Sequence, residues 1–290
     1  MIGIIGGTGL YDLPGLVDTE WRHIDSPFGA PSDALLFGRI GAHRIAFLPR
    51  HGRGHRLPPE AIPFRANIDA LKRAGATAVL SLSAVGSLRA ELTPGTFVLV
   101  DQFIDRTLRG PKTFFGTGCV AHVSMAHPTC ARVRGELAAA GAGLALPVVR
   151  GGTYVAMEGP QFSSLAESEL HRGLRCDVVG MTNMPEAKLA REAELCYATV
   201  AMVTDFDCWH PDHAHVVVGD VIRVLVANAD HARALVAAVI PRLGDHTGVC
   251  PHGCDRALEH AILTAAPARD PEVVSRLDAV AGRVLRSGLA

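Results

Sequence analysis

The sequence predicts an α/β fold: a single domain with a mixed, largely parallel, twisted central sheet flanked by helices. Short apolar runs alternate with amphipathic segments of helical period along the chain, as in proteins with parallel sheets. With 290 residues and 48% apolar composition, the chain can bury a large core. It carries no fixed-period repeat and no linker rich in Pro and Ser. We expect one domain over residues 1–243, with residues 244–290 as a C-terminal extension packed on it.

The first half of the chain predicts mostly strands. Apolar runs bounded by Gly, Pro or Asp indicate strands over residues 2–6, 34–48 (two strands around Gly41), 76–86 and 96–105. One helix is predicted between them, over residues 63–75, because its apolar residues recur at helical spacing and a glycine ends it.

Helices and strands alternate in the second half. Helices are predicted over residues 131–143, 164–174, 184–195, 216–243 and 272–285. Strands are predicted over residues 146–159 (a pair interrupted by two glycines), 176–181 and 196–207.

The charge and hydropathy pattern argues against several classes of protein. The formal net charge is -1 and no long basic run occurs, so neither nucleic acid nor an acidic membrane is expected as a partner. The first residues lack the basic region of a signal peptide, and no window approaches about 18 uninterrupted apolar residues. We expect a soluble, cytoplasmic protein.

Most of the seven cysteines are scattered, which is typical of reduced thiols. Cys250 and Cys254 are closer together, in "VCPHGCDR", with His252 between them. A metal site needs more clustered ligands than these, so no metal is expected. A local disulfide and two plain thiols both remain open.

A glycine turn follows the first predicted strand, in "GIIGGTGL". It lacks the third glycine of a dinucleotide fingerprint and the lysine of a P-loop. What remains is a loop whose backbone N–H groups and Thr8 hydroxyl could hold an anion. An anion site and a plain tight turn are both consistent with it.

Three other strand ends carry groups suited to phosphate. Arg50 and His51 stand in "LPRHGRGHR", which indicates a solvated basic loop or an anion clamp. "LSLSAVGSL" and "VVGMTNMPE" place small or hydroxyl residues after buried strands. Ligands of α/β sheets bind at such carboxyl ends. Taken together, these strand ends favour a phosphate site over exposure to water.

Two acids end the apolar run "CYATVAMVTDFD". Because strand residues alternate faces, Asp205 and Asp207 should project the same way. Two like charges at the end of a buried strand repel, and desolvation adds to the cost. Either the pair faces water, or a group with hydrogen-bond donors belongs there.

Several motifs in order along residues 2–243 resemble the methylthioadenosine branch of the trimeric purine nucleoside phosphorylase family. They are "IGIIGGTGL", "SPFGAPSDAL", "RHGRGH", "SAVGSL", "DQFIDRT", "MEGPQFSSLAES" and "MTNMPEAKLAREAELCYATVAMVTDFDCW". The resemblance implies a phosphorylase/hydrolase-like fold and cleavage of S-methyl-5′-thioadenosine by inorganic phosphate. The products would be adenine and 5-methylthioribose 1-phosphate. Phosphate is a co-substrate, and no cofactor is implied.

The resemblance also implies roles for individual residues. Phosphate would be bound by Thr8, Arg50, His51, Ser83, Ala84 and Thr182. The nucleoside would contact Phe162, Ser163, Met181, Asp205, Asp207, Val218, Val221 and Ile222, with His122 lent across a trimer interface. The two aspartates are the catalytic candidates. Asp205 would contact N7 of the leaving purine, either as a protonated acid that donates to N7 or as a carboxylate that stabilises an N7-protonated base, and a carboxylate near N6 would accept from the amine.

Alternatives stay open beside this hypothesis. One is a purine nucleoside phosphorylase of wider scope, or one acting on methylthioinosine or another 5′-substituted adenosine. A second is a binding protein without catalysis, and a third is an NAD-dependent oxidoreductase, for which the fingerprint is missing. His210, His213 and His215 are interpreted as lid or surface residues, with a contact to the 5′ substituent or to an interface as the alternative.

Overall fold

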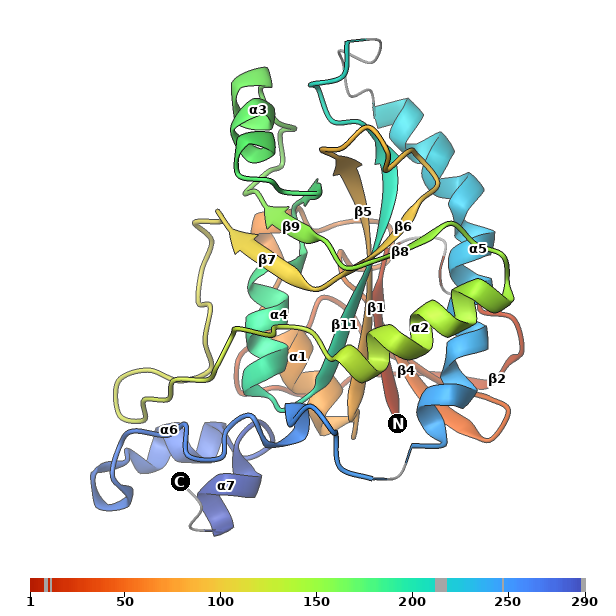
Figure 1. Ribbon diagram of the computed structural model, residues 1–290. Coiled ribbons are helices and arrows are strands. Elements are labelled where there is room, and N and C mark those ends of the chain that lie inside the picture. Colours follow the sequence, from red (N-terminus) through yellow and green to blue (C-terminus); the bar gives the residue numbers. More distant parts are fainter. Residues whose placement is uncertain (8–9, 11, 212–217, 247, 288–290) are drawn as a thin grey trace.

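The computed structural model contains one large sheet with helices on both of its faces (Figure 1). It describes residues 1–7, 10, 12–211, 218–246 and 248–287. Within these residues the sheet has 11 strands, in the order β2-β3-β4-β1-β5-β10-β9-β7, with β11 pairing β5 and β6, and β6 pairing β8. Both parallel and antiparallel pairs occur, so the predicted mixed α/β fold is confirmed.

The strands are β1 (Ile2–Gly6), β2 (Leu16–Arg22), β3 (Leu35–Ile40), β4 (His43–Pro49), β5 (Ala78–Ser87), β6 (Phe97–Val100), β7 (Gln102–Asp105), β8 (Val148–Arg150), β9 (Thr153–Ala156), β10 (Val178–Gly180) and β11 (Cys196–Asp205). The helices are α1 (Phe64–Arg73), α2 (Ala131–Gly143), α3 (Leu165–Gly173), α4 (Asn183–Glu192), α5 (Val218–Gly244), α6 (Pro271–Arg276) and α7 (Gly282–Ser287). Short 3₁₀ turns cover Pro59–Ala61, Cys254–Arg256 and Ala266–Ala268.

Four parallel strands form the centre of the sheet. β1 lies between β4 and β5, and β11 pairs with the other edge of β5. These strands are buried on both faces, which explains why they are nearly continuous apolar runs. Strand β5 is long enough to pair with β11 along its length and with β10, antiparallel, at its end.

Two hydrophobic clusters fill the space between sheet and helices. One contains side chains of α1 and α4, and the other contains side chains of α2 and α5. α1 contacts α4, and α2 contacts α5, so the helices pack as two pairs (Figure 1).

The C-terminal extension lies against the end of the sheet where β11 begins (Figure 1). The Leu258 N–H donates to Glu194 Oε1 at 3.0 Å, and Arg283 donates two hydrogen bonds to the same carboxylate. Leu258 is fully buried in the core, as are three residues of the final turns, Leu277, Val280 and Val284. The described part of the extension thus shares the core of the main domain.

The structure corrects several predicted elements. The run 96–105 is two strands, β6 and β7, because the chain turns at Asp101 to pair with a different neighbour on each side. The predicted helix 272–285 is two short helices, α6 and α7. Strand β2 was missed because it is an edge strand of mostly exposed residues and shows no apolar pattern.

Helix α5 contradicts the expectation, drawn from the lack of a long uninterrupted apolar run, that no segment could span a membrane. It is long and apolar enough to do so by length and composition alone. Its second half, however, packs into the core through Leu235, Val236, Val239 and Ile240. The core contact accounts for the apolar residues of this second half.

Candidate active site

Asp205 and Asp207 stand together at the end of β11, but not as alternating residues of one strand. The strand ends at Asp205, and Asp207 adopts φ 53°, in the left-handed region. The prediction that both project from the same strand face was therefore wrong in its geometry. In this turn the Asp207 N–H donates a hydrogen bond to Asp205 Oδ1 at 2.8 Å. Asp205 Oδ2 accepts a hydrogen bond from the Thr204 hydroxyl at 2.7 Å.

The two acids differ in what their oxygens bind. Both oxygens of Asp205 accept hydrogen bonds from the chain, whereas the buried Asp207 Oδ2 has no partner among the described residues. Burial raises the pKa of Asp205, and the charge of Asp207 adds to the increase, while the two hydrogen bonds oppose it. The site thus contains one carboxyl inclined to hold a proton and one unsatisfied acceptor.

Gly86 of β5 lies beneath both acids. A Cβ atom on this residue would stand 2.9 Å from Asp205 Oδ1 and 3.3 Å from the Asp207 Cβ. Only glycine lets the end of β11 approach β5 this closely. The glycine that breaks the run "SAVGSL" is thus explained by the approach of the two carboxylates.

Ser83 and Thr182 meet as the phosphate hypothesis requires. Their hydroxyl oxygens are 3.0 Å apart although β5 and the loop after β10 supply them separately. Both side chains are buried, at 5% and 7% exposure. Ser83 lies three residues before Gly86 on β5, which is about 10 Å along the strand.

Arg50 is held in a buried ion pair that the sequence analysis missed. Its Nε donates to Glu186 Oε2 at 2.9 Å, and its other nitrogens donate to Leu82 O, Ser81 Oγ and Glu186 Oε1. Arg50 is 2% and Glu186 1% exposed. The pattern "MPEAK" gave no sign of this partner, because an acid in a first helical turn is usually a surface residue.

A hydroxyl and amide network surrounds the same ion pair. Glu186 Oε1 accepts from the Ser81 hydroxyl at 2.6 Å and from the Tyr197 hydroxyl at 2.8 Å. The Asn183 amide nitrogen lies within 3.1 Å of the oxygens of Ser81, Tyr197 and Thr199. Asn183, whose role was unclear from the sequence, joins α4 to β5 and β11. The network fixes the orientation of Arg50.

His51 is neutral at physiological pH. Burial lowers its pKa to about 4, and the positive charge of Arg50 contributes, while the hydrogen bond to the Leu57 carbonyl opposes the shift. Its Nδ1 is 2.8 Å from the Leu57 oxygen. A carbonyl only accepts, so the proton stands on Nδ1 and Nε2 remains an acceptor. The ring also stacks on His55, with centroids 4.1 Å apart.

Arg109 fixes the loop that carries Met181. Its guanidinium donates to the carbonyl oxygens of Pro59, Met181, Met157 and Glu158. The Met181 side chain passes over Gly159, where a Cβ would stand 2.5 Å from the sulfur. Arg109 was also missed by the sequence analysis. It joins three loops that are distant in sequence.

The remaining predicted residues lie at the rim. Phe162 is 43% exposed. Ser163 is linked to the loop after β11, because Cys208 Sγ donates to the Ser163 carbonyl oxygen. Val218 and Ile222 are 57% and 52% exposed, and Val221 is partly buried, at the start of α5. These three apolar side chains thus remain partly or largely exposed at the start of α5.

Three predicted residues cannot be placed: Thr8, His213 and His215 lie outside the described residues. Ala84 is partly buried on β5, next to Ser83. His210 stacks on Phe206, with ring centroids 4.7 Å apart, so Phe206 packs against the loop that follows β11.

His122 stands apart from the other predicted residues of its own chain. Its N–H donates to the Ala261 carbonyl at 2.9 Å, and its side chain is exposed. The extension that carries Ala261 binds Glu194, at the start of β11, whereas the acids lie at the end of this 10-residue strand. A strand of that length spans about 30 Å.

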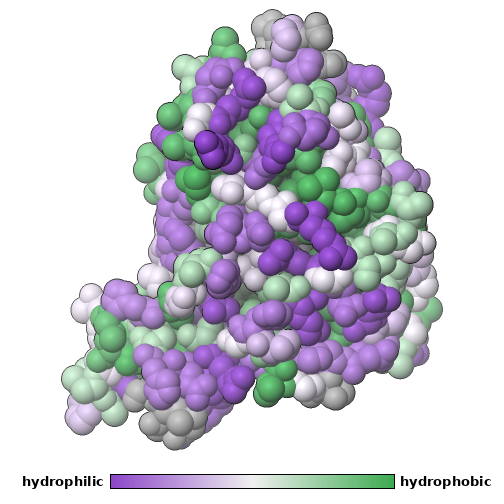
Figure 2. Space-filling model, viewed as in Figure 1, coloured by the Kyte–Doolittle hydropathy of each residue, from purple (hydrophilic) through white to green (hydrophobic). Residues whose placement is uncertain are grey.

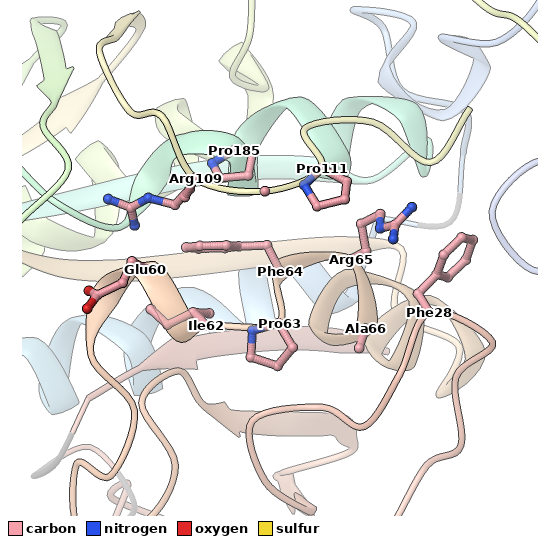
Figure 3. A pocket seen from close by; sticks show the side chains of 11 residues that line it. Phe28, Glu60, Ile62, Pro63, Phe64, Arg65, Ala66, Arg109, Pro111 and Pro185 are labelled. Carbon is pink, nitrogen blue, oxygen red and sulfur yellow. The ribbon is translucent and has the colours of Figure 1, made fainter. Parts of the chain in front are cut away.

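A pocket of about 190 Å³ opens beside Arg109 (Figure 3). Arg109 and Pro185 lie on one side of it, and Phe64 and Ile62 on the other. It contains none of the residues predicted to bind substrate. Arg109, which is 7% exposed, thus forms part of one wall of this pocket while it donates to the four carbonyl groups.

The fold and the site define the class of protein. A family model described as the phosphorylase superfamily matches residues 1–241, nearly the whole main domain. The chain belongs to this superfamily.

Curated relatives are named more narrowly. The S-methyl-5′-thioadenosine phosphorylase of Bradyrhizobium diazoefficiens is 61% identical over 286 residues, which cover 99% of this chain and 98% of that protein. The S-methyl-5′-thioadenosine phosphorylase of Cereibacter sphaeroides is 59% identical and covers 99% of each chain.

Solved structures agree with this similarity. A methylthioadenosine phosphorylase from an antarctic soil metagenomic library is 44% identical and superposes with a TM-score of 0.91, covering 96% of this chain and 98% of that chain. The methylthioadenosine phosphorylase of Schistosoma mansoni, in complex with adenine, is 38% identical with a TM-score of 0.79, covering 84% and 92%.

Proposed function

We propose that this enzyme cleaves S-methyl-5′-thioadenosine with inorganic phosphate, giving adenine and 5-methylthioribose 1-phosphate. One observation carries the proposal: an acid with a raised pKa and an unsatisfied carboxylate oxygen lie about 10 Å along β5 from a buried pair of hydroxyls. That spacing suits a nucleoside whose base meets the acids while phosphate attacks its ribose. The names of the relatives support the same reaction.

Phosphate is the nucleophile and needs no cofactor. The Ser83 and Thr182 hydroxyls can donate to it, and Arg50 supplies positive charge from its fixed position. Neutral His51 accepts through Nε2, which suits a phosphate oxygen that still carries a proton. Because these groups are ordered before substrate binds, positioning accounts for much of the rate enhancement.

The acids act on the leaving base. Asp205, with its raised pKa, donates to N7 as negative charge develops on the purine. The Asp207 Oδ2 accepts from the exocyclic amine at C6, a donor that satisfies this oxygen. A 6-oxo group offers only another acceptor there, so adenine is preferred over hypoxanthine.

The 5′ end of the nucleoside contacts the start of α5. Val218, Val221 and Ile222 present apolar side chains that accept a thioether and leave a hydroxyl without a partner. Discrimination of this kind is partial, since a hydrophobic pocket rejects a hydroxyl only weakly. Activity on adenosine is therefore expected to be lower but present.

We also propose a cytoplasmic homotrimer. His122 binds the extension, which meets the start of β11, whereas Asp205 lies at the other end of this strand, so a substrate contact of His122 is best supplied by a neighbouring chain. Exposed apolar side chains occur on α3 and at its two ends, in the upper part of the surface in Figure 2. They include Leu165, Leu170 and Leu174. Patches of this kind mark interaction surfaces.

Base release with and without phosphate tests the function. The enzyme should release adenine from S-methyl-5′-thioadenosine only when phosphate is present, and more slowly from adenosine. Release in water alone, or a preference for inosine, would show that the assignment is wrong. A broader purine nucleoside phosphorylase is the alternative, and equal rates on the 5′-hydroxyl and 5′-methylthio substrates would favour it.

A further inference from the structure

Four cysteines from three separate segments meet where β11 begins, at the end opposite the acids. Cys130 precedes α2, Cys196 opens β11, and Cys250 and Cys254 follow α5. Their sulfur atoms all lie within 4.8 Å of one another, and the Cys130 and Cys250 sulfurs are 3.7 Å apart. All four are buried free thiols, and none has a part in phosphorolysis.

The spacing of the sulfurs is that of a tetrahedral thiolate site. Zn–S bonds of about 2.3 Å in a tetrahedron place the sulfurs about 3.8 Å apart. One sulfur pair stands at about this distance, and no pair exceeds it by more than about 1 Å. Four soft ligands with no open position are characteristic of structural zinc rather than of catalytic zinc.

The backbone around Cys250 and Cys254 is shaped to bring both sulfurs to one point. The Gly253 N–H donates to the Cys250 carbonyl at 2.9 Å, and Gly253 adopts φ 64°, where glycine is favoured. Asp255 accepts from the Cys250 N–H at 2.9 Å and fixes the start of this turn. The chain therefore reverses between the two cysteines.

Groups that stabilise negative charge face the sulfurs. Cys130 is the residue before the first turn of α2, so the positive N-terminal end of this helix lies next to the cluster. The positive charge of Arg132 interacts with Cys196, and the buried Arg132 Nε has no hydrogen-bond partner among the described residues. A zinc ion with four thiolates carries two negative charges, so a cation and a helix N-terminus beside it are favourable.

We propose that Cys130, Cys196, Cys250 and Cys254 bind one Zn²⁺ in a closed structural site. On binding, the four thiols release their protons to solvent as four Zn–S bonds form, and no residue is oxidised or reduced. The ion fastens the C-terminal extension to α2 and to the first residue of β11. The expectation that Cys250 and Cys254 bind no metal rested on missing ligands, and residues far away in the sequence supply them.

Zinc content tests the proposal directly. The full chain, purified under reducing conditions without a metal-affinity tag, should contain one Zn²⁺ per chain by elemental analysis. Cys250→Ser should lower that content by about tenfold or more. The matched control, Cys176→Ser, removes a buried thiol outside the cluster and should leave the content unchanged.

A second measurement holds even where Cys250→Ser does not fold. Wild-type protein stripped with a chelator and fully reduced should bind Co²⁺ and show the intense absorption of tetrahedral cobalt thiolate. Removal of metal should also lower Tm, and Zn²⁺ should restore it. The proposal is overturned if the reduced protein holds no zinc and binds no Co²⁺. It is also overturned if the native protein contains disulfides among these four cysteines.

Discussion

At the residue scale, the buried pair of Arg50 and Glu186 sets the geometry of the phosphate site. Glu186→Gln removes the charge that compensates a fully buried guanidinium. We expect a loss of about 3–5 kcal/mol in unfolding free energy, because an unpaired buried charge remains. The KM for phosphate should rise more than the KM for the nucleoside. Denaturant unfolding and initial rates measure the two effects.

Glu169→Gln is the matched control for this change. Glu169 pairs with Arg172 on the exposed surface of α3, so its loss should cost less than about 1 kcal/mol. Equal effects of the two substitutions would show that the buried pair has no special part in the site.

His51 makes the stability depend on pH in a defined direction. Its pKa is about 4 in the folded protein and about 6.5 in an unfolded chain. The unfolded state therefore binds more protons between these values, so the stability from neutral His51 is lost as the pH falls from about 6.5 to about 4.

His51→Asn should reduce this dependence, since its amide keeps a donor near the Leu57 carbonyl but does not titrate there. Unfolding free energies of both proteins between pH 7 and pH 4.5 provide the measurement. If the unfolding free energies of the two proteins changed with pH in the same way, the conclusion that His51 is buried as a neutral ring would be wrong.

Sequence reasoning identified the residues that carry recognisable chemistry better than those that support them. Ser83 and Thr182 were predicted from small hydroxyl residues at strand ends, and their oxygens meet. Glu186 and Arg109 were missed, because burial and partners come from contacts between segments distant in sequence. The alternation rule also failed at Asp207, since the strand had already ended.

At the scale of elements, the central strands were predictable and the edges were not. β1, β5 and β11 are buried on both faces, so their apolar runs are unmistakable. β2 is exposed, and the break between β6 and β7 depends on which neighbours each strand pairs with. Pairing partners are a property of the folded sheet and leave little local pattern.

The loops joined by Arg109 should move when that residue is shortened. Arg109→Lys cannot donate to four carbonyl groups in three loops, so Met181 loses its support. We expect kcat/KM for the nucleoside to fall by about tenfold or more, as misplacement of a contact residue commonly does. Steady-state kinetics with saturating phosphate give this value.

Arg242→Lys serves as control, because Arg242 pairs with Glu136 on the exposed side of α5. Unchanged kinetics are expected for it. An Arg109→Lys enzyme with normal kinetics would exclude the positioning role.

At the scale of the whole molecule, sharing of sites between chains can be measured by mixing two variants. His122→Ala and Asp205→Asn should each be nearly inactive alone. In mixed oligomers, some sites combine intact Asp205 from one chain with intact His122 from another, so activity should return. Refolding the variants together and assaying base release tests this.

The central claim is that the acid pair over Gly86 selects a 6-amino purine for phosphorolysis. The most direct test is the ratio of kcat/KM for methylthioadenosine to that for methylthioinosine, in wild type and in Asp207→Asn. We predict a wild-type ratio of about 100 or more, since an unpaired buried acceptor costs about 1–3 kcal/mol and repulsion adds to it. The ratio should fall markedly in Asp207→Asn, whose amide can also donate. A wild-type ratio near one, or a ratio that the substitution leaves unchanged, would contradict the account.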